Sequence, residues 1–120
     1  MKQKVLIIED TPQNMYMLTY LLESSNYEVV QAFTGADGIA LAKETNPDVI
    51  LLGIQLPEMD GYAVARELRK IDELSAIPVI AVTSYAMVGD REKALESGAT
   101  GYIEKPIDPD TFISQMESFI

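Results

Sequence analysis

The sequence contains no cysteine and no histidine among its 120 residues. Without cysteine, the chain can form neither a disulfide framework nor a thiolate metal site. Without histidine, it lacks the most common general base of enzymes and the most common ligand of transition metals. These two absences disfavour hydrolase triads and zinc sites.

Basic residues are also few, since nine Lys and Arg stand against nineteen Asp and Glu and give a net charge of −10. A nucleic-acid-binding surface needs clustered Lys and Arg, and an anionic membrane would repel so acidic a chain. We therefore expect protein partners, with metal cations as small ligands, and neither nucleic acid nor membrane.

Long apolar runs are missing as well. No stretch of ~20 apolar residues is available to span a bilayer. The first four residues lead directly into a strand-like run, without a signal-peptide cleavage pattern. We expect the chain to reside in the cytoplasm.

The residues that are present favour one α/β domain over 1–120, because 48% of them are hydrophobic and the length suits a single core. Short apolar runs, the candidate strands, lie at 5–8, 28–32, 49–52, 79–83 and 101–104. Helix-like segments lie at roughly 12–24, 35–45, 61–70, 87–97 and 109–119. This alternation predicts a doubly wound fold with a five-stranded parallel sheet. The last predicted helix ends with the chain, and we expect no output domain in it.

Three local signals set the expected helix ends. Pro12 can occupy the first turn of a helix after Thr11, and Asp108 can cap a helix whose first residue is Pro109. Gly98 is placed to end the fourth helix.

The chemistry-bearing residues follow the predicted strands, at their carboxyl ends. These ends carry Glu9 and Asp10, then Gly53, then Thr83, and finally Lys105. In open parallel sheets, ligands bind beyond the carboxyl ends of the strands. Acids opposite a lysine suit a hard divalent cation and a phosphoryl group, and a threonine hydroxyl can donate to a further phosphoryl oxygen.

This array resembles the receiver domains of response regulators in two-component signalling. The resemblance covers nearly the whole chain and rests on the acidic pair, the LPEMDG loop at 56–61, Thr83, and Lys105 with Pro106. The segment at 78–90 is most similar to stand-alone receivers of the DivK kind. The resemblance implies a flavodoxin-like sheet with strand order 2-1-3-4-5.

The resemblance also implies roles for single residues. Glu9 and Asp10 would hold Mg²⁺ together with the backbone carbonyl of Gln55. Thr83 would be the switch hydroxyl, and Tyr102 the aromatic side chain that swings inward when the site is loaded.

The same resemblance assigns Lys105 to the acceptor carboxylate and later to the phosphoryl group, and it implies a cis peptide before Pro106. The acceptor aspartate would stand at position 53, where this sequence has Gly53. We therefore expect loss of the phosphorylation and dephosphorylation that such signalling proteins catalyse on themselves, weaker Mg²⁺ binding, and a Lys105 side chain that turns to Asp10.

The expected partners are a histidine kinase or histidine phosphotransfer protein, and a downstream protein. The surface for the downstream partner, around the fourth helix, fifth strand and fifth helix, would include Met87, Val88, Tyr102 and Ile107.

Two functional hypotheses remain open at this point. The chain is either an acceptor-less form of a phosphotransfer receiver, or a natural pseudo-receiver that binds proteins independently of phosphate. The intact Glu9, Asp10, Thr83 and Lys105 favour the first. A nucleotide-binding flavodoxin-like protein is disfavoured, because the acidic segment at 9–12 would repel a nucleotide phosphate. Gly53 on its own would also fit a simple strand-end bend.

Overall fold

The computed structural model describes residues 2–54, 56, 59–83 and 90–120, with the side chains of 90 and 91 excepted. Its strands are β1 (Lys4–Ile8), β2 (Glu28–Ala32), β3 (Val49–Gly53), β4 (Val79–Thr83) and β5 (Gly101–Glu104). They form one parallel sheet in the order β2-β1-β3-β4-β5. The predicted fold and strand order are confirmed, and the strand bounds agree to within one residue.

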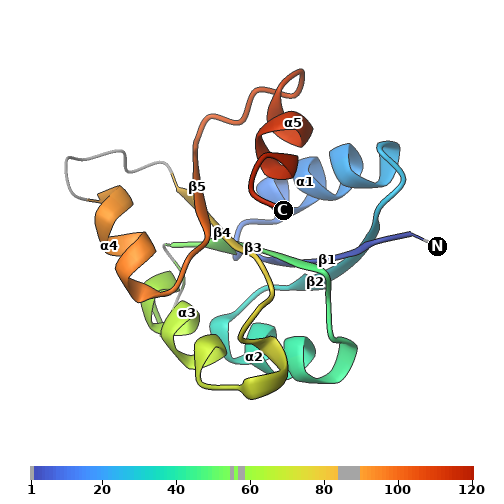
Figure 1. Ribbon diagram of the computed structural model, residues 1–120. Helices are drawn as coiled ribbons and strands as arrows, with labels where there is room; N and C mark the ends of the chain where they lie inside the picture. Colours follow the sequence, from blue (N-terminus) through green and yellow to red (C-terminus); the bar gives the residue numbers. More distant parts are fainter. Residues whose placement is uncertain (1, 55, 57–58, 84–89) are drawn as a thin grey trace.

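The helices cover both faces of this sheet. They are α1 (Pro12–Ser24), α2 (Gly35–Thr45), α3 (Gly61–Arg69), α4 (Asp90–Ser97) and α5 (Phe112–Glu117), with a short 3₁₀ helix η1 (Asp72–Leu74) before β4. Helices α1 and α5 lie on one face, and α2, α3 and α4 lie on the other (Figure 1). The domain is therefore doubly wound.

The core is divided by the sheet because successive strand side chains point to opposite faces. Ile7 and Leu51 pack into a cluster with residues of α1 and α5, whereas Ile8 and Leu52 pack into a second cluster with residues of α2 and α3. All four side chains are at most 1% exposed. Burial on both faces explains why these strands are continuously apolar in the sequence.

The start of α5 differs from the sequence prediction. The helix begins at Phe112 and not at Pro109. The carboxylate of Asp108 accepts a hydrogen bond of 3.0 Å from the Asp110 amide, and its carbonyl accepts one of 2.9 Å from the Phe112 amide. Asp108 therefore caps a turn that precedes the helix, which is a common alternative use of an aspartate side chain. The helix-start signal at Pro12 is confirmed.

Arg69, at the end of α3, joins three segments of the chain. Its guanidinium donates to the carbonyls of Gly98 at 2.7 Å and Ile77 at 2.8 Å, and to the hydroxyl of Thr100 at 3.2 Å. Two further hydrogen bonds of 3.2 Å reach the carbonyls of the last residue of η1 and of the residue after it. Gly98 has a φ of 117°, which favours glycine, so the fourth helix ends there as predicted.

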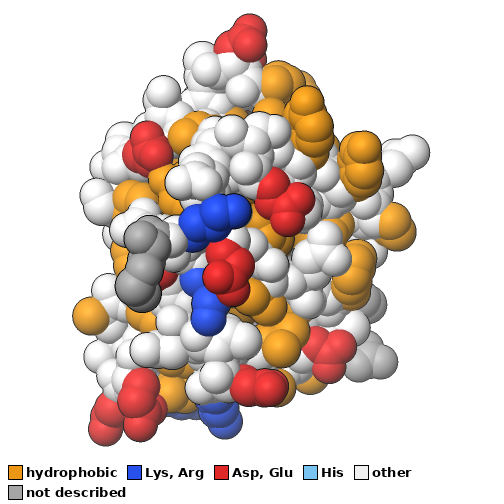
Figure 2. All heavy atoms as spheres, turned by 90° about the vertical axis from the view of Figure 1, so that its right-hand side faces the viewer, with side chains coloured by type: hydrophobic (Ala, Val, Ile, Leu, Met, Phe, Trp, Pro, Cys, Tyr) orange, Lys and Arg blue, Asp and Glu red, His pale blue; other side chains and the backbone are white. Residues whose placement is uncertain are grey.

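Charges of opposite sign are mixed on one face of the molecule. On the side where β1 begins, Lys and Arg side chains lie beside acidic and apolar ones and do not gather in one broad patch (Figure 2). Within the described residues, no helix is long and apolar enough to cross a membrane.

Candidate functional site

The strand register brings Glu9 beside Gly53. Ile8 pairs with Leu52 in the β1–β3 ladder. Glu9 and Gly53 are the next residues of these two chain segments and therefore lie side by side. Gly53 in turn pairs with Val82 of β4. The carboxyl ends of three neighbouring strands therefore meet at one place, as the sequence predicted.

Lys105 reaches the same place from β5. Thr83 pairs with Glu104, and the Lys105 amide donates a hydrogen bond of 2.8 Å to the Thr83 carbonyl. The Lys105–Pro106 peptide bond is cis, as expected. These contacts set the direction in which the lysine side chain leaves the backbone.

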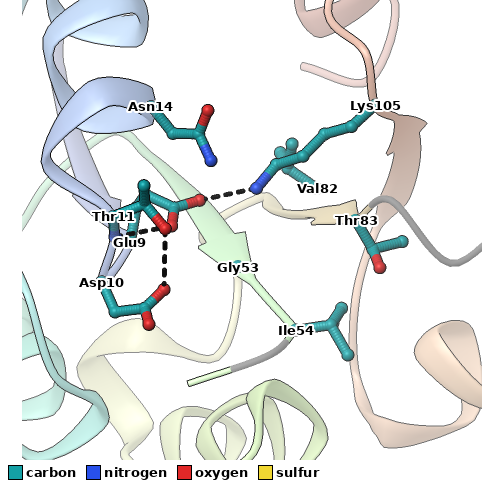
Figure 3. A pocket seen from close by; sticks show the side chains of 9 residues that line it. All are labelled: Glu9, Asp10, Thr11, Asn14, Gly53, Ile54, Val82, Thr83 and Lys105. Carbon is teal, nitrogen blue, oxygen red and sulfur yellow. Dashed lines mark hydrogen bonds and ion pairs between the residues drawn. The ribbon is translucent and has the colours of Figure 1, made fainter. Parts of the chain in front are cut away.

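A cavity of about 260 Å³ opens between these strand ends. Figure 3 shows Gly53 at the end of its strand, with the two acids on one side and Thr83 and Lys105 on the other. The lining residues are Glu9, Asp10, Thr11, Asn14, Gly53, Ile54, Val82, Thr83 and Lys105. Asn14 was missed in the sequence; a polar residue in the first turn of the helix after an acidic strand end was the available signal.

The central contact of the site is an ion pair between Glu9 and Lys105. The Lys105 Nζ donates to Glu9 Oε1 at 2.8 Å, and the lysine and glutamate side chains are 19% and 4% exposed. The other oxygen, Glu9 Oε2, accepts from the Thr11 amide at 3.0 Å. Our expectation that Lys105 would turn to Asp10 is therefore wrong. Asp10 is exposed to solvent, whereas the buried Glu9 carboxylate needs a counter-charge.

The ion pair sets the ionisation of Glu9. Burial acts to raise the pKa of the Glu9 carboxyl, but the hydrogen bonds from Lys105 and from the Thr11 amide, with the lysine charge, bring the pKa below its ordinary value. Glu9 is thus held as a carboxylate, which is the form that binds a metal ion.

The backbone at Gly53 does not require glycine. Among the described glycines, the positive φ belongs to Gly98. A Cβ built on Gly53 would lie 3.2 Å from the Ile8 carbonyl oxygen and 3.5 Å from Glu9 Oε1, so its neighbours need to move by only a few tenths of an ångström. A Cβ on Gly61, in contrast, would lie 2.6 Å from the Ile54 Cα. Steric need therefore accounts for Gly61 but not for Gly53.

Glu9 and Asp10 fit a partly hydrated Mg²⁺. Magnesium is commonly held by one or two carboxylates and keeps several waters, and both side chains line the cavity. Within the part of the chain that the structure describes, no group of three or more acidic side chains could enclose a metal ion. The Gln55 carbonyl, the third predicted ligand, lies outside the described residues.

Two of the other predicted residues lie where the sequence suggested. Thr83 is 3% exposed at the end of β4 and lines the cavity. Tyr102 is partly buried and packs against an apolar cluster. The members of this cluster are Ile54, Tyr62, Ala81, Ala94 and Ala99.

The predicted interaction surface needs one correction. Ile107 is only 8% exposed, because its side chain belongs to the core cluster of α1 and α5. It therefore does not lie on the surface of this structure. Met87 and Val88 lie outside the described residues.

Comparisons with known proteins agree with this geometry. Residues 5–117 match the family model of the response regulator receiver domain. The chain is 43% identical over 120 residues to the polar-differentiation response regulator DivK of Brucella anthropi, covering 100% of this chain and 98% of that protein. The identity is 42% to the DivK of Brucella ovis, with the same coverage.

Two solved structures extend the comparison. Chemotaxis protein CheY4 of Vibrio cholerae superposes with a TM-score of 0.95 at 25% identity and 100% coverage of both chains. The receiver domain of sensor histidine kinase PA1611 from Pseudomonas aeruginosa superposes with a TM-score of 0.91 at 31% identity, covering 99% of this chain and 98% of that one. The latter holds a magnesium ion coordinated in its active site cleft.

Proposed function

Because this chain belongs to the response regulator receiver domain family of two-component signalling, we propose that it is a receiver in which Gly53 occupies the phosphoacceptor position. In this role it docks to a histidine kinase or histidine phosphotransfer protein but accepts no phosphoryl group. We place this role in the cytoplasm.

The direction of the Cα–Cβ bond at position 53 carries the proposal. A side chain there would start 3.5 Å from Glu9 Oε1, inside the cavity that Thr83 and Lys105 also line. A carboxylate on that side chain would be within reach of the lysine and of a metal ion held by Glu9. Glycine at this position would leave the cavity without that carboxylate, while Glu9, Asp10, Thr83 and Lys105 line it.

The remaining residues of the cavity would have two roles in phosphoryl transfer, which are to bind the phosphoryl oxygens and to hold the metal ion. In a chain with aspartate at position 53, the N–P bond of a phosphohistidine breaks, a carboxylate oxygen forms the new O–P bond, and the imidazole leaves with its electron pair. Lys105 and the Thr83 hydroxyl are the groups that would bind the phosphoryl oxygens. Glu9 and Asp10 would hold Mg²⁺, which neutralises the charge gathered on these oxygens.

Without the acceptor, these groups can bind a phosphoryl donor but cannot form the O–P bond. The chain would then compete with intact receivers for the same histidine-containing partner. Its output surface, around α4 and β5, would not be switched by phosphate.

One observation favours a second candidate function. Lys105 neutralises the buried Glu9 carboxylate without phosphate or metal, which suits a pseudo-receiver that binds proteins in a single fixed state. In that case the pocket would not recover phosphotransfer when a carboxylate is restored.

Intact mass after incubation with Mg²⁺ and phosphoramidate tests the proposal. Three chains are compared: the unmodified chain, Gly53→Asp, and Gly53→Asn, which matches the aspartate in shape but is no nucleophile. We expect Gly53→Asp alone to gain the mass of one phosphoryl group. A folded Gly53→Asp chain that gains nothing would refute the acceptor assignment and leave the pseudo-receiver as the better account.

A further inference from the structure

We propose that Lys105 serves as the resident counter-cation of Glu9, so that a divalent metal ion enters this site only by displacing the lysine ammonium. The inference deepens the proposed function, since it takes Glu9 and Asp10 as the metal ligands. It adds that weak metal binding in this chain has a second cause besides the missing carboxylate.

The contacts of Glu9 show how the lysine blocks the site. Both carboxylate oxygens of Glu9 accept hydrogen bonds: Oε1 from Lys105 Nζ at 2.8 Å and Oε2 from the Thr11 amide at 3.0 Å. Oε1 is the oxygen that faces Gly53 and the cavity, because a Cβ at position 53 would lie 3.5 Å from it. The ammonium thus bonds the oxygen that a metal ion in the cavity would use.

The burial of the pair makes the competition strong. The Glu9 side chain is 4% exposed and that of Lys105 is 19% exposed, so solvent screens their charges poorly. A divalent ion bound to Glu9 would sit within a few ångströms of the ammonium and would be repelled by it. Metal binding therefore requires the lysine to leave, and its departure requires a new partner.

Gly53 cannot supply this new partner, because glycine has no carboxylate. A carboxylate at position 53 would offer the flexible lysine stem a second anion next to the first. Lys105 could then shift to residue 53 and release Glu9 to the metal. In the unmodified chain the lysine has no such alternative among the described acidic residues of the cavity except the exposed Asp10.

Titration of backbone amide resonances with Mg²⁺ tests this proposal on the unmodified chain, Lys105→Met and Lys105→Arg. Methionine keeps an unbranched stem of similar length and removes the charge, whereas arginine keeps the charge. Lys43→Met, which removes an exposed lysine remote from the cavity, controls for the change in net charge. We expect Lys105→Met to bind Mg²⁺ about tenfold more tightly or better, and the other two variants to stay within about twofold of the unmodified chain.

Equal or weaker Mg²⁺ binding by a folded Lys105→Met would overturn the proposal. Because removal of the lysine leaves Glu9 unpaired and can impair folding, a second measurement uses the unmodified chain. Its Lys105 side-chain resonances should shift along the Mg²⁺ titration with the same midpoint as the Glu9 carboxyl resonance. A Glu9 shift with unchanged Lys105 resonances would also overturn the proposal.

These outcomes are independent of the phosphorylation test. Failure of the lysine displacement leaves the mass gain of Gly53→Asp unaffected. Conversely, a Gly53→Asp chain that accepts no phosphoryl group can still show whether Lys105 and Mg²⁺ compete for Glu9.

Discussion

Placing an aspartate at position 53 should destabilise the metal-free protein. The new carboxylate would lie close to Glu9, because a Cβ at position 53 starts only 3.5 Å from Glu9 Oε1. At about 4 Å and an effective dielectric constant of about 20, two such charges repel each other by ~4 kcal/mol. Attraction to Lys105 offsets a similar amount, and repulsion by the exposed Asp10 adds about 1 kcal/mol. We therefore expect a net loss of about 1 kcal/mol in the free energy of unfolding.

Gly53→Asn is the matched reference for this loss. It has the shape of aspartate without its charge, and it removes the same strand glycine, which by itself costs about 0.5–1 kcal/mol relative to alanine. Urea unfolding of the two variants in EDTA, extrapolated to zero urea, gives the difference directly. The free energy of unfolding of Gly53→Asp should be the lower of the two.

Magnesium should then reduce this difference in the free energy of unfolding between Gly53→Asp and Gly53→Asn. A ligand at ten times its dissociation constant stabilises the folded state by about 1.4 kcal/mol, so millimolar Mg²⁺ should restore most of the loss in Gly53→Asp and little in Gly53→Asn. An aspartate variant that is more stable than the asparagine variant in EDTA would refute the reasoning. So would equal stabilisation of both variants by Mg²⁺.

Three further predictions concern single residues. Gly53→Ala should be neutral or slightly stabilising in thermal unfolding, whereas Gly61→Ala, whose Cβ would meet backbone at 2.6 Å, should lower the free energy of unfolding by about 2 kcal/mol; equal effects would contradict the steric distinction. Arg69→Ala, which removes five hydrogen bonds, should lower the free energy of unfolding measured with urea by about 2–3 kcal/mol. Arg69→Lys should lower it by roughly half of that. A loss within error of zero would show that the carbonyls find other donors. The folded-state pKa of Glu9 is lowered, so its contribution to stability is present above the unfolded pKa and is lost as the pH falls through the folded pKa. Glu9→Gln should therefore reduce the dependence of the free energy of unfolding on pH below about pH 4. An unchanged pH dependence in this acid range would count against the ion pair.

The fold was predictable from the sequence because two independent signals agree. The central strands β1, β3 and β4 are buried on both faces and therefore stand out as apolar runs. The carboxyl ends of parallel strands meet at one edge of the sheet, which places Glu9, Gly53 and Lys105 together without any knowledge of the helices. The start of α5 was not predictable, because Asp108 can cap either a helix or a turn with the same oxygen atoms. The choice between the helix cap and the turn cap depends on how Phe112 packs, and the local sequence contains no information on that packing.

The partner of Lys105 and the burial of Ile107 depend on tertiary packing. Sequence places Glu9 and Asp10 equally near the lysine, and only their different burial decides that the lysine pairs with Glu9. Ile107 follows a strand end, where an apolar side chain can face solvent or core; here it joins the core cluster of α1 and α5. Asn14 is one of several polar residues on α1. Its place in the first helical turn after the acidic strand end was the signal in the sequence, and its position beside the cavity identifies it in the structure.

The most direct test of the account is to locate the phosphoryl group in Gly53→Asp. After incubation with Mg²⁺ and phosphoramidate, borohydride reduction converts an aspartyl phosphate to homoserine, and tandem mass spectrometry of the digest identifies the residue. The account predicts homoserine at position 53, and none in the unmodified chain. Homoserine at Asp10 or elsewhere, or in the unmodified chain, would contradict the claim that Gly53 occupies the acceptor position.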